Sequence, residues 1–233
     1  MIDAEQTFIQ YGIDSVTCQL QRIYNKDKVL IMNTYQAYLK RNKRNICLHV
    51  LSCKMMGMPF GAKLVRGAYA TEENKIALDQ EVESPVFPNK SLVDKNYDET
   101  LTFVIAHLPA RSHFTVASHN DTSIDTGLEA VLKRKKELED EKSQVSFAQL
   151  KGLGDRLTYK LAEKGHYTFK YLPYGPTHNL MPYLFRRAEE ASYIWTEGQK
   201  KLADVKKELF EIRRFHYRVG AGLAGMAALL MIL

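Results

Sequence analysis

The stretch AKLVRGAYA (residues 62–70) decides the fold expected for this chain. Residues 62–65 have the composition of the end of a buried strand, and Arg66, Gly67 and Tyr69 follow at once. A strand that only packs in a core has no use for Lys63 and Arg66 at its end, because charged side chains are rarely buried without a partner. A strand that ends at a binding site does, so the stretch predicts a site at the carboxyl end of a parallel strand.

The rest of the chain alternates short apolar runs with amphipathic stretches. The runs predict six strands, at residues 1–4, 29–35, 62–67, 114–118, 145–150 and 168–172. Apolar residues at helical spacing predict helices between them, for example along Tyr97–Leu108 and Ile124–Leu132, and a last helix along Leu202–Ile212. The stretch 84–98, with two prolines, is predicted to be a long crossover loop. Alternating strands and helices predict a parallel sheet that helices cover.

Polar residues follow many of these strands, including Asp3, Asn33, Lys63, His119 and Tyr171. A doubly wound sheet gathers its ligand contacts at one switch point and usually carries GxGxxG, a motif that this sequence lacks. A barrel builds its site from the ends of all its strands. We therefore expect an α/β fold of the (β/α)8 TIM-barrel type over residues 1–213, incomplete here with about six βα units.

The composition limits the classes of partner that the chain is expected to bind. The chain has 233 residues, 45% of them hydrophobic and 26% charged, with a net charge of +6. A modest positive charge favours anionic partners, but the basic residues are dispersed, so nucleic acid is not expected. Three cysteines without a CxxC pair predict neither a disulfide framework nor a zinc site, and no metal site is expected. The first residues resemble neither a signal peptide nor a transit peptide.

Residues 214–233 form a tail in which a basic run precedes the fifteen uncharged residues 219–233. A spanning helix needs about 20 apolar residues, so this run is short. A shallow membrane anchor and a helix packed on the barrel both remain open.

A second informative stretch is YLPYGPTHNLMPYLFRRAEE (residues 171–190). Arg186 and Arg187 are adjacent, and Glu190 lies about one turn further along a helix. Two guanidinium groups can grip a carboxylate through paired N–H donors. The alternative is a solvated arginine pair with a helical ion pair. A glycosidase site built on Asp3 and Glu190 is less attractive, because sugars carry no charge for the arginines to match.

Six motifs together resemble the proline dehydrogenase family. They are IDAEQT (2–7), NTYQ (33–36), AKLVRGAY (62–69), ASHN (117–120), KYLPYG (170–175) and PYLFRR (182–187), in the family's order over residues 1 to about 195. The resemblance implies a (β/α)8 barrel that holds FAD, oxidises L-proline to 1-pyrroline-5-carboxylate and passes electrons to quinone. It also implies that the strands and an active-site lysine at the front of the family's barrel are not in this sequence. Ala191 stands where the family tends to have asparagine.

The resemblance assigns roles residue by residue. The implied flavin contacts are Asn33, Lys63, Val65, Arg66, Gly67 and His119, with Lys63 near the flavin N5. The implied anchor of the proline carboxylate is Arg186 and Arg187, with Glu190 as their acidic neighbour. The residues implied to close over the substrate ring are Tyr69, Leu150 and Tyr171, and Asp3 lies beside the substrate. A cation near the flavin would stabilise its reduced, anionic form.

Alternatives stay open at this point. The chain is either the larger part of a working enzyme or a truncated, non-catalytic member of the family. The substrate is either proline or hydroxyproline, and a related FAD barrel such as a methylenetetrahydrofolate reductase fits the double arginine less well. Eukaryotic members of the family are mitochondrial and associate with the inner membrane, so the resemblance implies that location.

Overall fold

Five parallel strands form the sheet in the computed structural model, which describes residues 1–178 and 180–185. They are β1 (Asn33–Gln36), β2 (Gly61–Val65), β3 (His113–Ala117), β4 (Gln144–Leu150) and β5 (Tyr167–Tyr171). The strands lie side by side in chain order, and each pairs with the next in parallel. A doubly wound sheet reverses its order at a switch point, and this sheet has no reversal. The arrangement is that of a barrel wall, as predicted.

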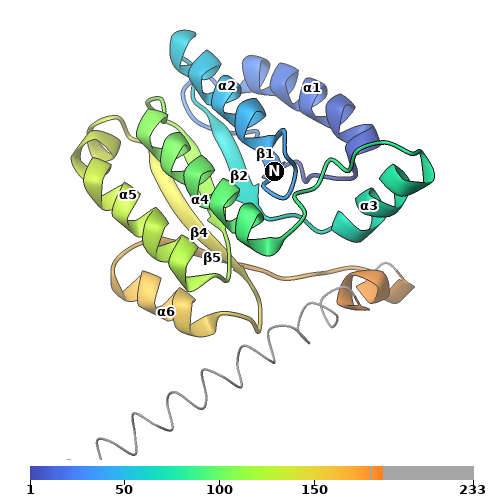
Figure 1. Cartoon of the computed structure of the whole chain (residues 1–233). Helices are drawn as coiled ribbons and strands as arrows, with labels where there is room; N and C mark the ends of the chain where they lie inside the picture. The colour runs from blue at the N-terminus through green and yellow to red at the C-terminus, as the bar shows by residue number, and fades with distance from the viewer. Residues whose placement is uncertain (179, 186–233) are drawn as a thin grey trace, which may run out of the picture. The chain divides into compact units, whose positions relative to one another are not determined.

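Six helices of the described part connect or precede these strands. They are α1 (Thr7–Tyr24), α2 (Asn42–Met55), α3 (Ala70–Asp79), α4 (Lys90–His107), α5 (Asp121–Asp140) and α6 (Asp155–Glu163). In Figure 1, α2, α4 and α5 lie side by side in front of the sheet. Helices on one face of a sheet in sequential order are what a barrel wall requires, because its other face turns toward the barrel interior.

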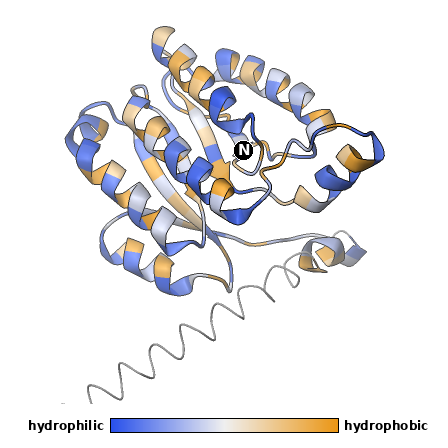
Figure 2. Cartoon of the chain, in the orientation of Figure 1, coloured by the Kyte–Doolittle hydropathy of each residue, from blue (hydrophilic) through white to orange (hydrophobic). Residues whose placement is uncertain are grey.

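The core lies between the sheet and these helices. Its strand residues all alternate onto one face: Tyr35, Ala62, Leu64, Phe114, Val116, Val145 and Phe147. The helices add the predicted stripes, with Tyr97, Leu101 and Val104 from α4 and Ile124 and Leu128 from α5. Figure 2 shows the hydrophobic colouring of the strands behind these helices. We call this face the core face of the sheet and the opposite one the inner face.

Two asparagine caps fix where α4 and α5 begin. The side chain of Asn89 accepts a hydrogen bond from the Leu92 N–H, and that of Asn120 accepts one from the Ser123 N–H. Each bond satisfies an N–H that has no partner within the first turn of its helix. Helix α4 thus starts at Lys90, and the prediction of a loop through residue 98 is wrong for its second half.

The prediction of six strands is also wrong, because residues 1–4 form no strand. The Ile2 N–H does donate to the Met32 carbonyl at 2.9 Å, in the manner of a neighbouring strand. The segment's carbonyls, however, are taken by side chains of β1: Thr34 Oγ1 donates to Ile2 O and Gln36 Nε2 to Glu5 O, each at 2.9 Å. Side-chain bonds hold the segment beside β1 without a backbone ladder. The second predicted strand starts later than expected, at Asn33.

Residues 1–172 form one compact unit, and residues 173–233 belong to a second. Of the second unit the structure describes residues 173–178 and 180–185, with helical residues at 177–178 and 180–185. Within the described ranges, the helices are too short or too polar to cross a membrane. The predicted last helix and the tail at 214–233 lie outside the described residues.

Candidate functional site

The inner face of the sheet carries a row of side chains that runs across all five strands. Strand register and alternation place five residues in this row: Thr34, Lys63, Thr115, Ser146 and Tyr167. Four are polar, and Thr115 Oγ1 lies 3.0 Å from Ser146 Oγ, which in turn lies 2.9 Å from His113 Nε2. Polar side chains that bond one another inside a sheet are satisfied without water. Lys63 is the one cation of the row.

Lys63 pairs with Asp3, and the structure thus brings together two predicted site residues that are far apart in sequence. Lys63 Nζ lies 2.5 Å from Asp3 Oδ1. The lysine side chain is 13% exposed and the aspartate 60% exposed, so the pair joins a largely buried cation to a carboxylate open to solvent. The segment that carries Asp3 is fixed by its bonds to Thr34 and Gln36. It is fixed also by the buried carboxylate of Glu73, which accepts the Thr7 N–H at 2.5 Å.

Small apolar side chains lie next to this row, toward the carboxyl ends of the strands. Val65, Ala117 and Ala148 share the inner face with Lys63, because each lies two residues beyond a member of the polar row. All three are partly exposed, and Leu150 continues the patch on β4. A cation beside small, partly exposed apolar side chains is a combination that suits a planar, electron-accepting ring. Of this patch, Val65 and Leu150 were predicted site residues.

The Arg66 side chain lies on the core face, toward the helices, whereas that of Lys63 lies on the inner face, because successive strand residues alternate between the two faces. Its Nε donates to Asp94 Oδ1 at 2.7 Å, Nη1 to Ser118 Oγ at 2.7 Å and Nη2 to Ser123 Oγ at 2.9 Å. The guanidinium carbon also lies 4.5 Å from the centre of the Tyr97 ring. Contacts within the chain therefore occupy all three nitrogens of this predicted flavin ligand.

Gly67 has a structural reason of its own to be glycine. Its φ is +122°, and a Cβ there would lie 1.6 Å from Cδ1 of the Tyr38 ring. Both observations exclude a side chain. In this structure the close neighbour of Gly67 is the ring of Tyr38, where the resemblance implied a cofactor.

His119 links the ends of β3 and β4. Its Nε2 accepts the Leu150 N–H at 2.9 Å, which makes Nδ1 the ring nitrogen that carries the proton in the neutral form. The next turn packs closely, because a Cβ on Gly154 would lie 3.2 Å from the His119 ring. The predicted flavin contact His119 and the predicted substrate contact Leu150 thus lie side by side.

The remaining predicted residues are spread more widely. Tyr69 is partly buried immediately before α3, and Tyr171 ends β5 with 47% of its surface exposed. Asn33 is fully buried on the core face, where its Nδ2 donates to Asp14 Oδ1 at 2.9 Å. The structure does not bring Asn33 together with Lys63. Arg186, Arg187 and Glu190 lie outside the described residues.

The sequence analysis did not predict two residues of this region: Gln36, which lies on the inner face, and Asp94, which pairs with Arg66. Gln36 shares the inner face with Val65, its register partner, whereas Asn33 of the same NTYQ motif does not. The alternation of NTYQ could have found it, because the apolar Tyr35 marks the core face and puts Asn33 with it. Asp94 gave no signal in sequence, because its partner Arg66 is 28 residues away.

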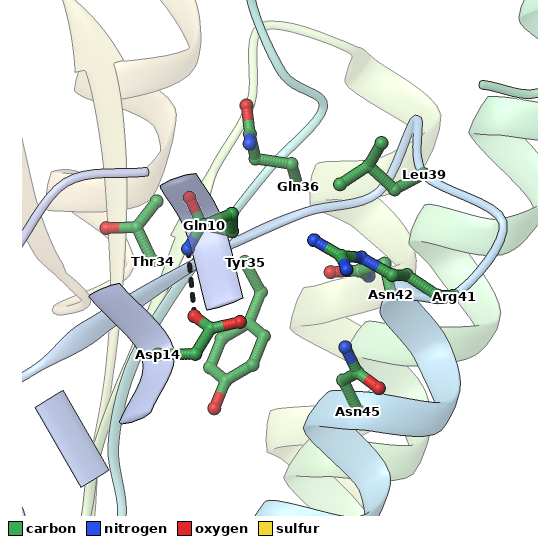
Figure 3. Close-up of a pocket in the computed structure, with 9 residues that line it drawn as sticks. All are labelled: Gln10, Asp14, Thr34, Tyr35, Gln36, Leu39, Arg41, Asn42 and Asn45. Carbon is green, nitrogen blue, oxygen red and sulfur yellow. Dashed lines mark hydrogen bonds between the residues drawn. The ribbon is translucent and has the colours of Figure 1, made fainter. Parts of the chain in front are cut away.

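A small pocket lies on the far side of β1, between α1 and α2. It is lined by Gln10, Asp14, Thr34, Tyr35, Gln36, Leu39, Arg41, Asn42 and Asn45, and Figure 3 shows Arg41 and Asp14 on opposite walls. It has room for about one water molecule. Arg41 Nη1 and Nη2 have no hydrogen-bond partner in the described structure. None of the predicted site residues that the structure describes lines it.

A second polar cluster joins α1 to α2. The Tyr35 hydroxyl bonds His49 Nδ1, and Cys18 Sγ lies 3.7 Å from His49 Nε2. Burial lowers the pKa of His49 to about 4 and raises the pKa of Cys18. A neutral imidazole beside a neutral thiol is a structural contact and gives no activated nucleophile. Among the described residues no group of three potential ligands could hold a metal ion.

The sequential parallel sheet with helices on one face defines the chain as part of an α/β barrel. A family model described as proline dehydrogenase matches residues 1–194. Proline dehydrogenase 1, mitochondrial, of Homo sapiens is 39% identical over 198 residues, which cover 83% of this chain and 32% of that protein. The chain belongs to the proline dehydrogenase family.

Further relatives support membership of this family. The Drosophila melanogaster proline dehydrogenase 1, mitochondrial, is 34% identical over 227 residues, covering 92% of this chain and 32% of that protein. A hydroxyproline dehydrogenase of Xenopus laevis is 33% identical over 223 residues, which cover 94% of this chain and 47% of that protein. The chain thus spans about a third to a half of the length of these relatives.

Solved structures support the barrel class. Proline utilization A (PutA) from Bdellovibrio bacteriovorus, inactivated by N-propargylglycine, superposes with a TM-score of 0.71 at 24% identity and matches 79% of this chain and 19% of that one. A bifunctional PutA gives a TM-score of 0.66 at 27% identity, and the match covers 79% of this chain and 18% of that one. The predicted fold class is confirmed, with five strands of the wall in place of the expected six.

Proposed function

We propose that this chain carries the flavin and substrate side of an FAD-dependent proline dehydrogenase, which oxidises L-proline to 1-pyrroline-5-carboxylate and passes the electrons to quinone. The observation that carries the proposal is the Lys63–Asp3 pair beside the apolar patch on the inner face. Family membership supports the chemistry, and the mitochondrial names of the relatives support a mitochondrial location. Association with the inner membrane, through the tail or otherwise, is part of the proposal.

The residues on the inner face suit FAD. When bound, FAD would supply the acceptor for the hydride that leaves the carbon next to the proline nitrogen. Lys63 would hold a positive charge at the edge of the flavin, where negative charge develops on reduction. Val65, Ala117 and Ala148 would exclude water from the ring, which strengthens that electrostatic contact. Gly67 and His119 would border the cofactor through the loops after β2 and β3.

The substrate would be held by its carboxylate. Arg186 and Arg187 would bind it bidentately, with Glu190 orienting one guanidinium. Tyr69, Leu150 and Tyr171 would close over the pyrrolidine ring, and Asp3 would stand beside it as the partner of Lys63. No nucleic acid and no metal enters this function. Water exclusion and orientation are the main contributions of these side chains.

Hydroxyproline is a second candidate substrate. The Xenopus laevis hydroxyproline dehydrogenase matches 94% of this chain at 33% identity, against 83% at 39% and 92% at 34% for the two proline dehydrogenases above. An extra hydroxyl on the ring is discriminated only where a site forms a hydrogen bond to it or leaves it unpaired. Measuring both substrates on the same preparation decides between them.

The test is a flavin titration of the purified chain, followed by L-proline without oxygen. We expect a bound flavin absorption band that bleaches with proline, and loss of flavin affinity in Lys63→Met. Lys43→Met is the matched control, because Lys43 forms an exposed ion pair with Glu99 away from the inner face. A parent chain that binds no flavin refutes the proposed function. A Lys63→Met variant that binds flavin as well as the parent refutes the assigned role of Lys63. A stable flavin complex that proline leaves oxidised identifies a non-catalytic member.

A further inference from the structure

Arg66 is the centre of a polar hub at the carboxyl ends of β2 and β3. We define the hub as Arg66, Asp94, Tyr97, Ser118 and Ser123. The three guanidinium nitrogens bond three side chains, each from a different segment: Asp94 in α4, Ser118 after β3 and Ser123 in α5. An arginine fork held at every nitrogen has one geometry, so it fixes the segments it touches.

The other members tie the hub to the backbone of the strands. The buried Tyr97 hydroxyl lies 3.1 Å from the Ala117 carbonyl and 3.3 Å from the Leu64 carbonyl, at the ends of β3 and β2. Ser118 Oγ also accepts the Asn120 N–H at 3.1 Å, and the Ser118 carbonyl accepts Gln149 Nε2 at 3.3 Å. The network therefore spans the turn that carries His119 and reaches β4.

Asp94 supplies the charge that this hub needs. Arg66 and Asp94 are both about a quarter exposed, so solvent screens their ion pair only in part. Asp94 Oδ2 also accepts Lys90 Nζ at 2.5 Å, one turn earlier on α4. Partial burial raises the pKa of Asp94, but the hydrogen bonds from Lys90 and Arg66 outweigh it and hold the pKa below its usual value. The carboxylate is thus ionised at neutral pH.

We propose that Asp94 is a positioning residue that acts through Arg66: it holds the guanidinium across the ends of β2 and β3 and so sets the backbone of Gly67 and His119 for the cofactor. Arg66 thereby supports the loops of the flavin site from the core face of the sheet, whereas Lys63 lies on the inner face and would contact the ligand. The inference rests on the proposed function for its cofactor, but the hub itself is a contact network within residues 1–172. It gives a reason for a carboxylate at position 94 that the resemblance did not imply.

The variant Asp94→Asn tests the hub, with Lys90→Gln as matched control. Lys90→Gln removes the exposed partner of Asp94 and leaves Arg66 untouched. The first readout is amide hydrogen exchange at Ser118 and Asn120 in the full chain, which we expect to quicken about tenfold in Asp94→Asn and to stay unchanged in the control. Unchanged exchange in Asp94→Asn overturns the hub, whether or not the chain binds flavin.

The second readout is the flavin dissociation constant of the same variants. We expect about tenfold weaker binding in Asp94→Asn, the scale of one charge-assisted hydrogen bond. In an Arg66→Gln background, Asp94→Asn should cause no further loss, because the carboxylate acts only through Arg66. If Asp94→Asn weakens flavin binding equally in the parent chain and in the Arg66→Gln variant, the positioning role is overturned. A parent chain without flavin affinity counts against the proposed function, and hydrogen exchange then decides the hub alone.

Discussion

Replacing Gly67 by alanine separates a structural glycine from one that serves only a cofactor. The backbone there has a φ of +122°, and the new Cβ would lie 1.6 Å from the Tyr38 ring. The ring cannot retreat into solvent without loss, because Tyr38 is 4% exposed and packs with Leu39 and Val86. We therefore expect the substitution to destabilise the free chain, with no ligand present.

The magnitude has two parts. An alanine forced into a sparsely populated backbone region costs on the order of 1–3 kcal/mol. Displacing a packed ring to make room costs about 1–3 kcal/mol more. We expect the free energy of unfolding to fall by about 4 kcal/mol in Gly67→Ala. The matched control is Gly57→Ala, whose φ is +64° with nothing within 4 Å of the new Cβ, and which should lose only about 1–2 kcal/mol.

The assay is denaturant unfolding followed by circular dichroism, on both variants and on Tyr38→Ala with and without Gly67→Ala. Removing the ring removes the overlap, so the double variant should lose less than the sum of its parts, by about 1–3 kcal/mol. A Gly67→Ala chain as stable as Gly57→Ala contradicts this reasoning. If such a chain also failed to bind flavin, close approach of the cofactor would be the reason for the glycine.

Two further predictions concern the buried polar groups. Because burial lowers the folded pKa of His49 to about 4 while the unfolded chain titrates near 6.5, the unfolded state binds the proton first as pH falls. The free energy of unfolding should therefore decrease between pH 6.5 and 4, by up to about 3 kcal/mol, and His49→Gln should flatten this part of the profile measured by urea titration. Tyr97→Phe should cost about 1–2 kcal/mol in the same assay, because it removes the one hydroxyl donor that the Ala117 and Leu64 carbonyls share. Tyr159→Phe, at an exposed position, should cost nothing measurable.

The sequence predicted the barrel class from the right signal. Polar residues after successive strands indicated a site built from many strand ends, and the sheet has the sequential order that such a site requires. Periodicity also predicted the buried stripes of α4 and α5, because three or four apolar residues per two turns specify a helix face directly. These features are local in sequence and were therefore accessible.

The errors came from side chains that act in place of the backbone. Residues 1–4 have the composition of a strand, but the Thr34 side chain bonds the Ile2 carbonyl, the Gln36 side chain bonds the Glu5 carbonyl just after the segment, and no ladder forms. Asn89 caps α4 through its side chain, so a stretch with two prolines turns into a helix sooner than its composition suggests. Both outcomes depend on one or two hydrogen-bonding side chains, which the average composition of a segment does not reveal.

The site residues divide according to strand alternation. Lys63 and Arg66 lie three positions apart, so strand alternation predicts that their side chains leave β2 on opposite sides. Lys63 took the inner face with Val65, and Arg66 took the helix side with Asp94. Asn33 followed Tyr35 to the core face for the same reason. Only the pairing partners, Asp3 and Asp94, required the fold, because they lie 60 and 28 residues away.

Each strand-end cation thus meets a carboxylate of its own chain, and the two pairs differ in what a ligand can do to them. Asp94 is held by Arg66 and Lys90 together, so a ligand gains little by competing for Arg66. Asp3 is 60% exposed and its pair with Lys63 is partly open to water, where an ion pair is weak. A flavin that gains negative charge on reduction would compete with Asp3 for the lysine and win most readily in its reduced form. Under the proposed function, the Lys63–Asp3 pair is therefore the contact that would respond to the redox state of a bound flavin, whereas the Arg66–Asp94 pair would stay intact.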